Sequence, residues 1–123
     1  MSSPKVLPRV LIVDESADNR EVLRTALARR GIETLEAANA SEGLQMACER
    51  RPDVIVLDLE EKRQDAAVAG KRFAEAANGS GSQLIILGKA RRGPAFTGGH
   101  VIGKPYHFAP LIHTIERMAG KAA

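Results

Sequence analysis

Residues 51–60 read RPDVIVLDLE and contain a continuous apolar run from Val54 to Leu57. A short run that is apolar throughout and rich in β-branched residues is typical of a strand buried on both faces of a sheet. Pro52 disfavours a helical conformation in the residue before it, so any helix preceding the run should end there. The stretch therefore predicts a buried strand over residues 53–59, with Asp58 at its carboxyl end.

Similar apolar runs recur along the chain, and segments with helical spacing separate them. The other expected strands cover residues 9–15, 32–38, 83–87 and 100–103, and the expected helices cover residues 16–31, 41–51, 66–77 and 107–120. Strands that alternate with helices predict a parallel sheet with helices on both faces. Right-handed crossovers then favour a doubly wound arrangement.

Residues near the ends of these segments indicate where the helices begin and stop. Ser16 and Asp18 are candidate N-caps of the first helix, and Gly31 is a candidate stop signal. The Asn-Gly-Ser-Gly-Ser run at residues 78–82 predicts a loop. Pro110 should lie in the first turn of the last helix, where its missing N–H is tolerated.

The length and composition indicate one domain of a globular protein. We place it at residues 1–123, with a flexible lead-in over residues 1–8. Three phenylalanines and one tyrosine are the only aromatic residues, so a nucleic-acid module that stacks bases on aromatic rings is not expected. The net charge of +3 comes from scattered basic pairs, which do not indicate binding to DNA or a membrane.

Cys48 is the single cysteine, which excludes a disulfide within the chain and fits a reducing compartment. It falls on the apolar side of the helix expected over residues 41–51, so we expect a small buried side chain there. The N-terminus lacks the apolar core of a signal peptide, and no stretch reaches the ~18 apolar residues of a membrane span. We therefore expect a cytoplasmic protein.

The residues at the carboxyl ends of the expected strands matter most, because doubly wound sheets bind their ligands there, and most of these residues are charged. These ends carry Asp14, Glu15, Asp58, Gly88 and Lys104. Clustered carboxylates repel one another, and Mg²⁺ relieves the repulsion while keeping several water ligands. A carboxylate beside Mg²⁺ and a lysine can also act as a nucleophile toward a phosphoryl donor. Each residue alone could be an ordinary loop or surface group, but the set favours a site.

Three segments in order resemble the landmarks of the receiver domain of bacterial two-component response regulators. They are VLIVDES at residues 10–16, RPDVIVLDLE at residues 51–60 and GKPY at residues 103–106. The resemblance covers nearly the whole chain, and its specificity lies in the ordered set. It implies an α/β, doubly wound five-stranded parallel sheet of the flavodoxin-like type, with strand order 2-1-3-4-5.

The resemblance also implies roles for individual residues. Asp58 would be the phosphoacceptor, and Lys104 would pair with the phosphoryl group. The bond from Lys104 to Pro105 would be cis, an isomer that is accessible at X–Pro bonds. The implied ligands of the Mg²⁺ cofactor are Asp14, Glu15, Asp58 and the main-chain carbonyl of Glu60.

The chain departs from the family pattern at several of these positions. Glu15 stands where Asp is commoner. Gly88 lacks the hydroxyl that would contact the phosphoryl oxygens, and Lys89 stands where a small residue is usual, so it could add a cation or block the pocket. Val101 stands where an aromatic switch residue is frequent. The segment before Lys104 is short, so the family's fourth helix should be short or absent.

Two functions remain open at this stage. The first is a receiver that accepts a phosphoryl group from a histidine kinase or phosphotransfer protein and signals through a downstream protein. It would catalyse at most its own phosphorylation and dephosphorylation. The second is a phosphorylation-independent protein-binding module, because the usual reporter residues are missing.

Two other readings have little support in the sequence. A small flavodoxin-like nucleotide binder would need glycines that open a helix, and Gly98, Gly99 and Gly103 do not. A histidine metal site would need partners at a suitable spacing. The three histidines, which lack such a spacing, are His100, His107 and His113.

Overall fold

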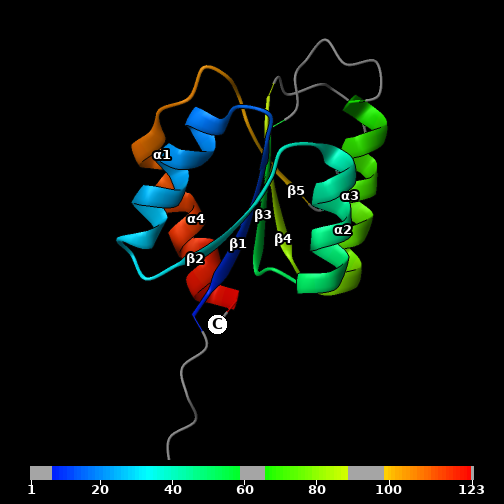
Figure 1. Ribbon diagram of the computed structural model, residues 1–123, viewed down its shortest axis with the longest axis horizontal. Coiled ribbons are helices and arrows are strands. Elements are labelled where there is room, and N and C mark those ends of the chain that lie inside the picture. The colour runs from blue at the N-terminus through cyan, green and yellow to red at the C-terminus, as the bar shows by residue number, and fades with distance from the viewer. Residues whose placement is uncertain (1–6, 59–65, 89–98, 123) are drawn as a thin grey trace, which may run out of the picture.

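Five parallel strands form one sheet in the order β2-β1-β3-β4-β5 (Figure 1). The strands are β1 (Arg9–Asp14), β2 (Glu33–Ala37), β3 (Val54–Asp58), β4 (Gln83–Leu87) and β5 (Gly99–Ile102). This computed structural model describes residues 7–58, 66–88 and 99–122. The order confirms the doubly wound sheet expected from the sequence. The strand that suggested it, β3, lies at the centre and is buried along its whole length.

Helices cover both faces of this sheet. The described residues form α1 (Ala17–Ala28), α2 (Ala40–Arg50), α3 (Ala66–Ser80) and α4 (Phe108–Ala122). Figure 1 shows α1 and α4 on one face and α2 and α3 on the other. Val10 and Ile12 of β1 pack into the core on the α1 and α4 side, and Leu11 and Val13 pack on the α2 and α3 side. Burial on both faces explains why the central strands read as continuous apolar runs.

The packing of α2 against the sheet depends on Gly43. A Cβ added at this residue would lie 2.7 Å from Cγ2 of Val13 and 3.0 Å from Cζ of Phe73. Both contacts are shorter than packed carbon atoms tolerate, so a larger residue would push α2 away from β1 or from α3. Gly43 therefore allows the closest approach between this helix and the sheet.

Side-chain oxygens cap two of the helices. Ser16 Oγ accepts a hydrogen bond of 3.2 Å from the N–H of Asn19, which confirms Ser16 as the N-cap of α1. Asp18, the other candidate, lies in the first turn instead. Asn39, which the sequence patterns did not predict as a cap, caps α2 in the same way, because its Oδ1 accepts a 2.8 Å hydrogen bond from the N–H of Glu42. Pro110 lies in the first turn of α4, as expected.

Glycines in the left-handed conformation stop two helices. Gly31 has φ of 74° and Gly81 has φ of 75°. In each case the N–H of the following residue bonds back to a helix carbonyl, at 3.1 Å after α1 and 2.8 Å after α3. Gly31 is therefore the stop that the sequence predicted. The prediction of a loop over residues 78–82 is wrong for residues 78–80, which belong to α3. The helix ends at Gly81 and not at Gly79.

Cys48 corrects another expectation, because its side chain is exposed. The buried positions of α2 are Gly43 and Ala47, and Leu44 beside them is half-buried. Successive residues of an α-helix are rotated by about 100°, so Cys48 lies at the margin of that stripe rather than within it.

Several expectations fall outside the described residues. They are residues 1–6 of the lead-in expected over residues 1–8, the metal-ligand role of Glu60, the phosphate contact of Lys89, and the short or absent helix within residues 89–98. In the described part of the chain, no helix combines the length and apolar character needed to cross a membrane.

Candidate functional site at the carboxyl edge of the sheet

Strands β1 and β3 end side by side in two buried carboxylates. Asp14 and Asp58 are Cα partners across the two strands, and each is the last residue of its strand. Only 5% of Asp14 and 7% of Asp58 is exposed to solvent. Removing two carboxylates from water costs free energy unless each is paired or hydrogen-bonded. Two such acids at a ligand-binding edge mark a candidate functional site.

Lys104 reaches the same edge from the segment that follows β5. Its Nζ donates a hydrogen bond to Oδ1 of Asp58 and forms an ion pair with it. About two thirds of the Lys104 side chain is covered, since its exposed fraction is 33%. The bond from Lys104 to Pro105 is cis, as predicted. The structure thus brings Asp14, Asp58 and Lys104 together from three separate parts of the chain.

The electrostatics of Asp58 reflect opposing influences. Burial raises the pKa of the Asp58 carboxyl, and the charge of Asp14 raises it as well. The hydrogen bond and the charge of Lys104 act in the opposite direction, although the pKa of Asp58 stays above its ordinary value. Lys104 is therefore the group that favours the anionic form of Asp58 at this edge.

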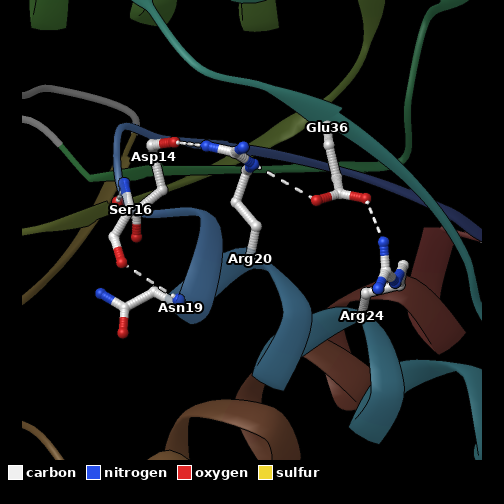
Figure 2. Close-up of polar contacts among 6 residues, drawn as sticks. All are labelled: Asp14, Ser16, Asn19, Arg20, Arg24 and Glu36. Carbon is white, nitrogen blue, oxygen red and sulfur yellow. Dashed lines mark hydrogen bonds and ion pairs between the residues drawn. The ribbon is translucent and has the colours of Figure 1, made fainter.

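The three acceptor atoms of Asp14 have different surroundings (Figure 2). The N–H of Ser16 donates a 2.8 Å hydrogen bond to Oδ1 of Asp14, and the guanidinium of Arg20 donates one to its main-chain carbonyl. Oδ2 of Asp14 is buried and has no hydrogen-bond partner among the described residues. A buried acceptor without a donor is unfavourable, which points to a cation or donor as its ligand.

Sequence reasoning did not single out Tyr106, which lies close enough to the two acids to feel their charges. Its ring is half-buried and meets Phe108 edge-on, with ring centroids 5.6 Å apart. Burial raises the pKa of the Tyr106 hydroxyl to about 12, with further contributions from Asp58 and Asp14. The signal in the sequence was its position directly after Lys104 and Pro105, a segment already expected at the site.

Two of the remaining candidates, Glu15 and Gly88, directly follow strands that end at this edge. Glu15 follows Asp14 in an exposed bend. Gly88 follows β4, and its N–H donates a 3.0 Å hydrogen bond to the carbonyl of Ile102. A Cβ added at Gly88 would have no described atom within 4 Å. Val101 lies half-buried within β5. The exposed histidines are His100, His107 and His113.

Comparison with known proteins decides the family. A family model described as the response regulator receiver domain matches residues 10–89. The chain belongs to this family. The matched part of the receiver domain contains Asp14, Asp58 and Gly88, and Lys104 lies beyond it. Domains of this family are in general signalling modules of two-component systems rather than enzymes.

Curated relatives share parts of this receiver domain. It is 44% identical over 52 residues to the transcriptional regulatory protein PrrA of Mycobacterium tuberculosis. The aligned residues cover 42% of this chain and 22% of PrrA. It is 28% identical over 81 residues to Protein PilH of Pseudomonas aeruginosa. That alignment covers 66% of this chain and 67% of PilH. In the first of these relatives, the residues that match this receiver domain make up only about a fifth of the relative's own length.

Solved structures of receiver domains share its fold. The CheY-like receiver domain from Methanospirillum hungatei superposes with a TM-score of 0.78 at 22% identity, covering 95% of this chain and 97% of that one. CheY4 of Vibrio cholerae superposes with a TM-score of 0.74 at 24% identity, covering 92% and 99%. These likenesses show the flavodoxin-like fold that the sequence resemblance implied.

Receiver domains in general bind Mg²⁺, and the carboxylates of this edge suit that ion. Asp14 offers a buried oxygen without a hydrogen-bond partner in the described structure, beside the carboxylate of Asp58. Mg²⁺ commonly binds through one or two carboxylates and keeps several waters, so a closed cage of side chains is not required. Within the described ranges, no three or more acidic, histidine or cysteine side chains form such a cage. The fit therefore rests on the Asp14 and Asp58 pair.

Proposed function

We propose that this receiver domain accepts a phosphoryl group on Asp58 in phosphorelay signalling. The observation that supports this function best is the ion pair between Lys104 and Asp58 beside the buried Asp14. Phosphoryl transfer needs an oxygen nucleophile and positive charge near the transferring oxygens. These groups lie together at the edge where doubly wound sheets bind ligands.

In the proposed reaction, a carboxylate oxygen of Asp58 attacks the phosphorus atom of the donor. A new O–P bond forms as the bond from phosphorus to the leaving group breaks, and the leaving group departs with that electron pair. The product is an acyl phosphate on Asp58. Burial and Asp14 favour the protonated acid, so Lys104 has a specific task, which is to favour the anion that attacks.

Lys104 then stabilises the charge of the transferred group, because its ammonium can shift its contact from Asp58 to a phosphoryl oxygen. Gly88 and Lys89 follow β4 at the proposed phosphate-contact position. The proposed ligands of Mg²⁺ are Asp14, Glu15, Asp58 and the carbonyl of Glu60. When bound, this ion supplies positive charge to the phosphoryl oxygens.

Receiver domains interact with histidine kinases or phosphotransfer proteins. We propose that one of these classes supplies the phosphoryl group to Asp58 in the cytoplasm. A downstream protein would then read the modified domain through direct contacts. Neither nucleic acid nor membrane binding is part of the proposed role of this domain.

Intact mass spectrometry after incubation with Mg²⁺ and acetyl phosphate tests this function. We expect one phosphate adduct on the wild-type protein and none on Asp58→Asn. Asp53→Asn is the matched control, because Asp53 lies just before β3 at the opposite edge, where its Oδ2 accepts a 2.8 Å hydrogen bond from the N–H of Arg9. That variant should keep the adduct.

A phosphorylation-independent binding module is the second candidate. It is favoured by Gly88 and Val101, which lack the hydroxyl and the aromatic ring that the resemblance associates with reporting the phosphate. A wild-type protein that is folded but shows neither an adduct nor measurable Mg²⁺ binding would support this candidate and contradict phosphorylation on Asp58.

A further inference from the structure

Arg20 connects the acidic edge to two other elements of the fold. It lies in the first turn of α1, and only 17% of its side chain is exposed. The guanidinium donates one hydrogen bond to the main-chain carbonyl of Asp14. Its Nε donates another, of 3.3 Å, to Oε1 of Glu36 in β2. Figure 2 shows Arg20 between these two residues, so one side chain links the ends of β1 and β2 to α1.

Glu36 restricts the orientation of Arg20 because it also binds a second arginine. Its Oε2 accepts a 3.0 Å hydrogen bond from Nη1 of Arg24, one turn further along α1. Arg24 has 48% of its side chain exposed and contacts Glu36 rather than Asp14 (Figure 2). With both carboxylate oxygens engaged by cations, Glu36 has few alternative orientations in which it could hold Arg20.

Asp14 is held on its other side by the turn that enters α1. The N–H of Ser16 donates to Oδ1 of Asp14, and Oγ of Ser16 accepts from the N–H of Asn19. Two of the three acceptor atoms of Asp14 are therefore occupied, the carbonyl by Arg20 and Oδ1 by Ser16. Oδ2 is the acceptor that has no partner in the described residues.

We propose that Arg20 is a positioning residue for the acidic edge. By binding the main-chain carbonyl of Asp14, it fixes the peptide plane that leads into the Ser16 turn. The next peptide, between Glu15 and Ser16, carries the N–H of Ser16, and this N–H orients the Asp14 carboxylate so that Oδ2 remains available to a divalent cation. The inference rests on the proposed function, because the orientation of Oδ2 matters only if the edge binds a cation.

Two variants separate this role from a general contribution to stability. Arg20→Gln and Arg24→Gln each remove one positive charge and one ion pair with Glu36, but only Arg20 contacts Asp14. We expect Arg20→Gln to weaken Mn²⁺ binding about tenfold, a typical loss for a residue that orients a metal ligand. Arg24→Gln should stay within about twofold of the wild type, because the Asp14 carbonyl keeps its donor.

A second measurement needs no metal. Amide hydrogen exchange at Ser16, followed by NMR in the presence of a chelator, should be faster in Arg20→Gln than in Arg24→Gln. Exchange at Ile55 in the buried centre of β3 should be alike in the two variants. Arg20→Lys keeps the charge but lacks the planar fork of donors, so it should restore only part of the Mn²⁺ affinity.

Equal Mn²⁺ affinities together with equal Ser16 exchange in the two variants would overturn the positioning role. If the wild-type protein binds no Mn²⁺, the metal part of the proposed function fails instead, and Ser16 exchange alone decides whether Arg20 orients the turn. If Arg20→Gln does not fold, Arg20→Lys takes its place in both comparisons. Wild-type Mn²⁺ affinity and wild-type Ser16 exchange in Arg20→Lys would then overturn the inference.

Discussion

Asp14 and Asp58 are Cα partners at the ends of two neighbouring strands, and both carboxylates are buried. Only Asp58 has the Lys104 ammonium as an ion-pair partner in the described structure. The fold therefore holds two like charges together without fully compensating them, which is unfavourable for stability. Functional sites commonly carry such an arrangement, because a ligand or a reaction later uses the unfavourable charge.

Replacing Asp58 by Asn should stabilise the metal-free protein at neutral pH. The substitution removes a buried charge, and Lys104 can turn its ammonium to solvent because its side chain is one-third exposed, at 33%. We expect the free energy of unfolding to rise by on the order of 1 kcal/mol, the usual scale of single substitutions. Urea denaturation in the presence of a chelator measures the change.

The pH dependence of Asp58→Asn provides an independent check. Folding raises the pKa of Asp58 above its ordinary value of 3.8, so the folded state binds more protons than the unfolded state above that pH. The contribution of Asp58 to stability must then fall as the pH rises from near 3.8 through its raised pKa. Asp58→Asn should lack this decline, and an unchanged decline would contradict the assignment.

Replacing Lys104 by Met should raise the pKa of Asp58 further, because Lys104 is the group that lowers it. Carboxyl resonances followed by NMR across a pH titration measure this shift. The rate of phosphorylation by acetyl phosphate should fall at least about tenfold, as the loss of one charge-stabilising group typically causes. Lys71→Met, which alters an exposed lysine of α3, is the control and should leave both quantities unchanged.

Restoring a hydroxyl at Gly88 should increase phosphorylation of Asp58. A Cβ at Gly88 has no described atom within 4 Å, although the φ of 159° makes any side chain there strained, in Gly88→Ser and Gly88→Ala alike. One added hydrogen bond to a phosphoryl oxygen should raise the equilibrium ratio of phosphorylated to unmodified protein about two- to tenfold. Intact mass at a fixed concentration of acetyl phosphate measures that ratio. Gly88→Ala separates the hydroxyl from any backbone effect, and equal ratios in the two variants would contradict the prediction.

Tyr106 should ionise at unusually high pH. The chain has one tyrosine and no tryptophan, so phenolate absorbance reports on Tyr106 alone. We expect a midpoint at about 12 instead of the ordinary 10.0. Because folding raises this pKa, the contribution of Tyr106 to stability should fall as the pH rises from 10.0 toward 12.

Asp58→Asn should lower the Tyr106 midpoint only in part, since burial is the largest cause of the shift. A midpoint near the ordinary value in the folded wild-type protein would show that the Tyr106 hydroxyl is solvated and lies away from the acids.

Gly43→Ala should destabilise the protein, although alanine favours helices. The added methyl group would clash with Val13 and Phe73, and overpacking of this kind costs about 1–3 kcal/mol. Gly79→Ala in α3 is the matched control, because a Cβ there has no described atom within 4 Å. It should stabilise the protein by up to about 1 kcal/mol. Thermal denaturation distinguishes the two, and an equal response would show that α2 adjusts freely.

Local patterns in the sequence were sufficient for the order of the elements. The apolar run at Val54 to Leu57 predicted the central strand, and its burial on both faces is the reason such a run exists. Parallel strands carry their carboxyl ends to one edge, so Asp14, Asp58 and Lys104 could be grouped from topology alone. The family resemblance added the cis bond at Pro105, which the structure confirms.

Interactions between distant segments were beyond such patterns. Helical spacing placed Cys48 on the apolar side of α2, but the packed helix buries Gly43 and Ala47 and leaves Cys48 exposed. The end of α3 depends on which of two nearby glycines adopts a left-handed conformation, and Gly81 does so. Sequence spacing favoured both wrong predictions because it describes one segment at a time.

The sequence by itself determined the strand and helix order, the parallel sheet and the residues that end each strand, because these follow from periodicity and from the geometry of crossovers. Only the tertiary structure decided how the charges at that edge are paired. It assigned Lys104 to Asp58, Arg20 to the carbonyl of Asp14, and neither of them to Oδ2 of Asp14. Hydrogen bonds and burial depend on distances between side chains from separate elements, and those distances exist only once the sheet and its helices have packed.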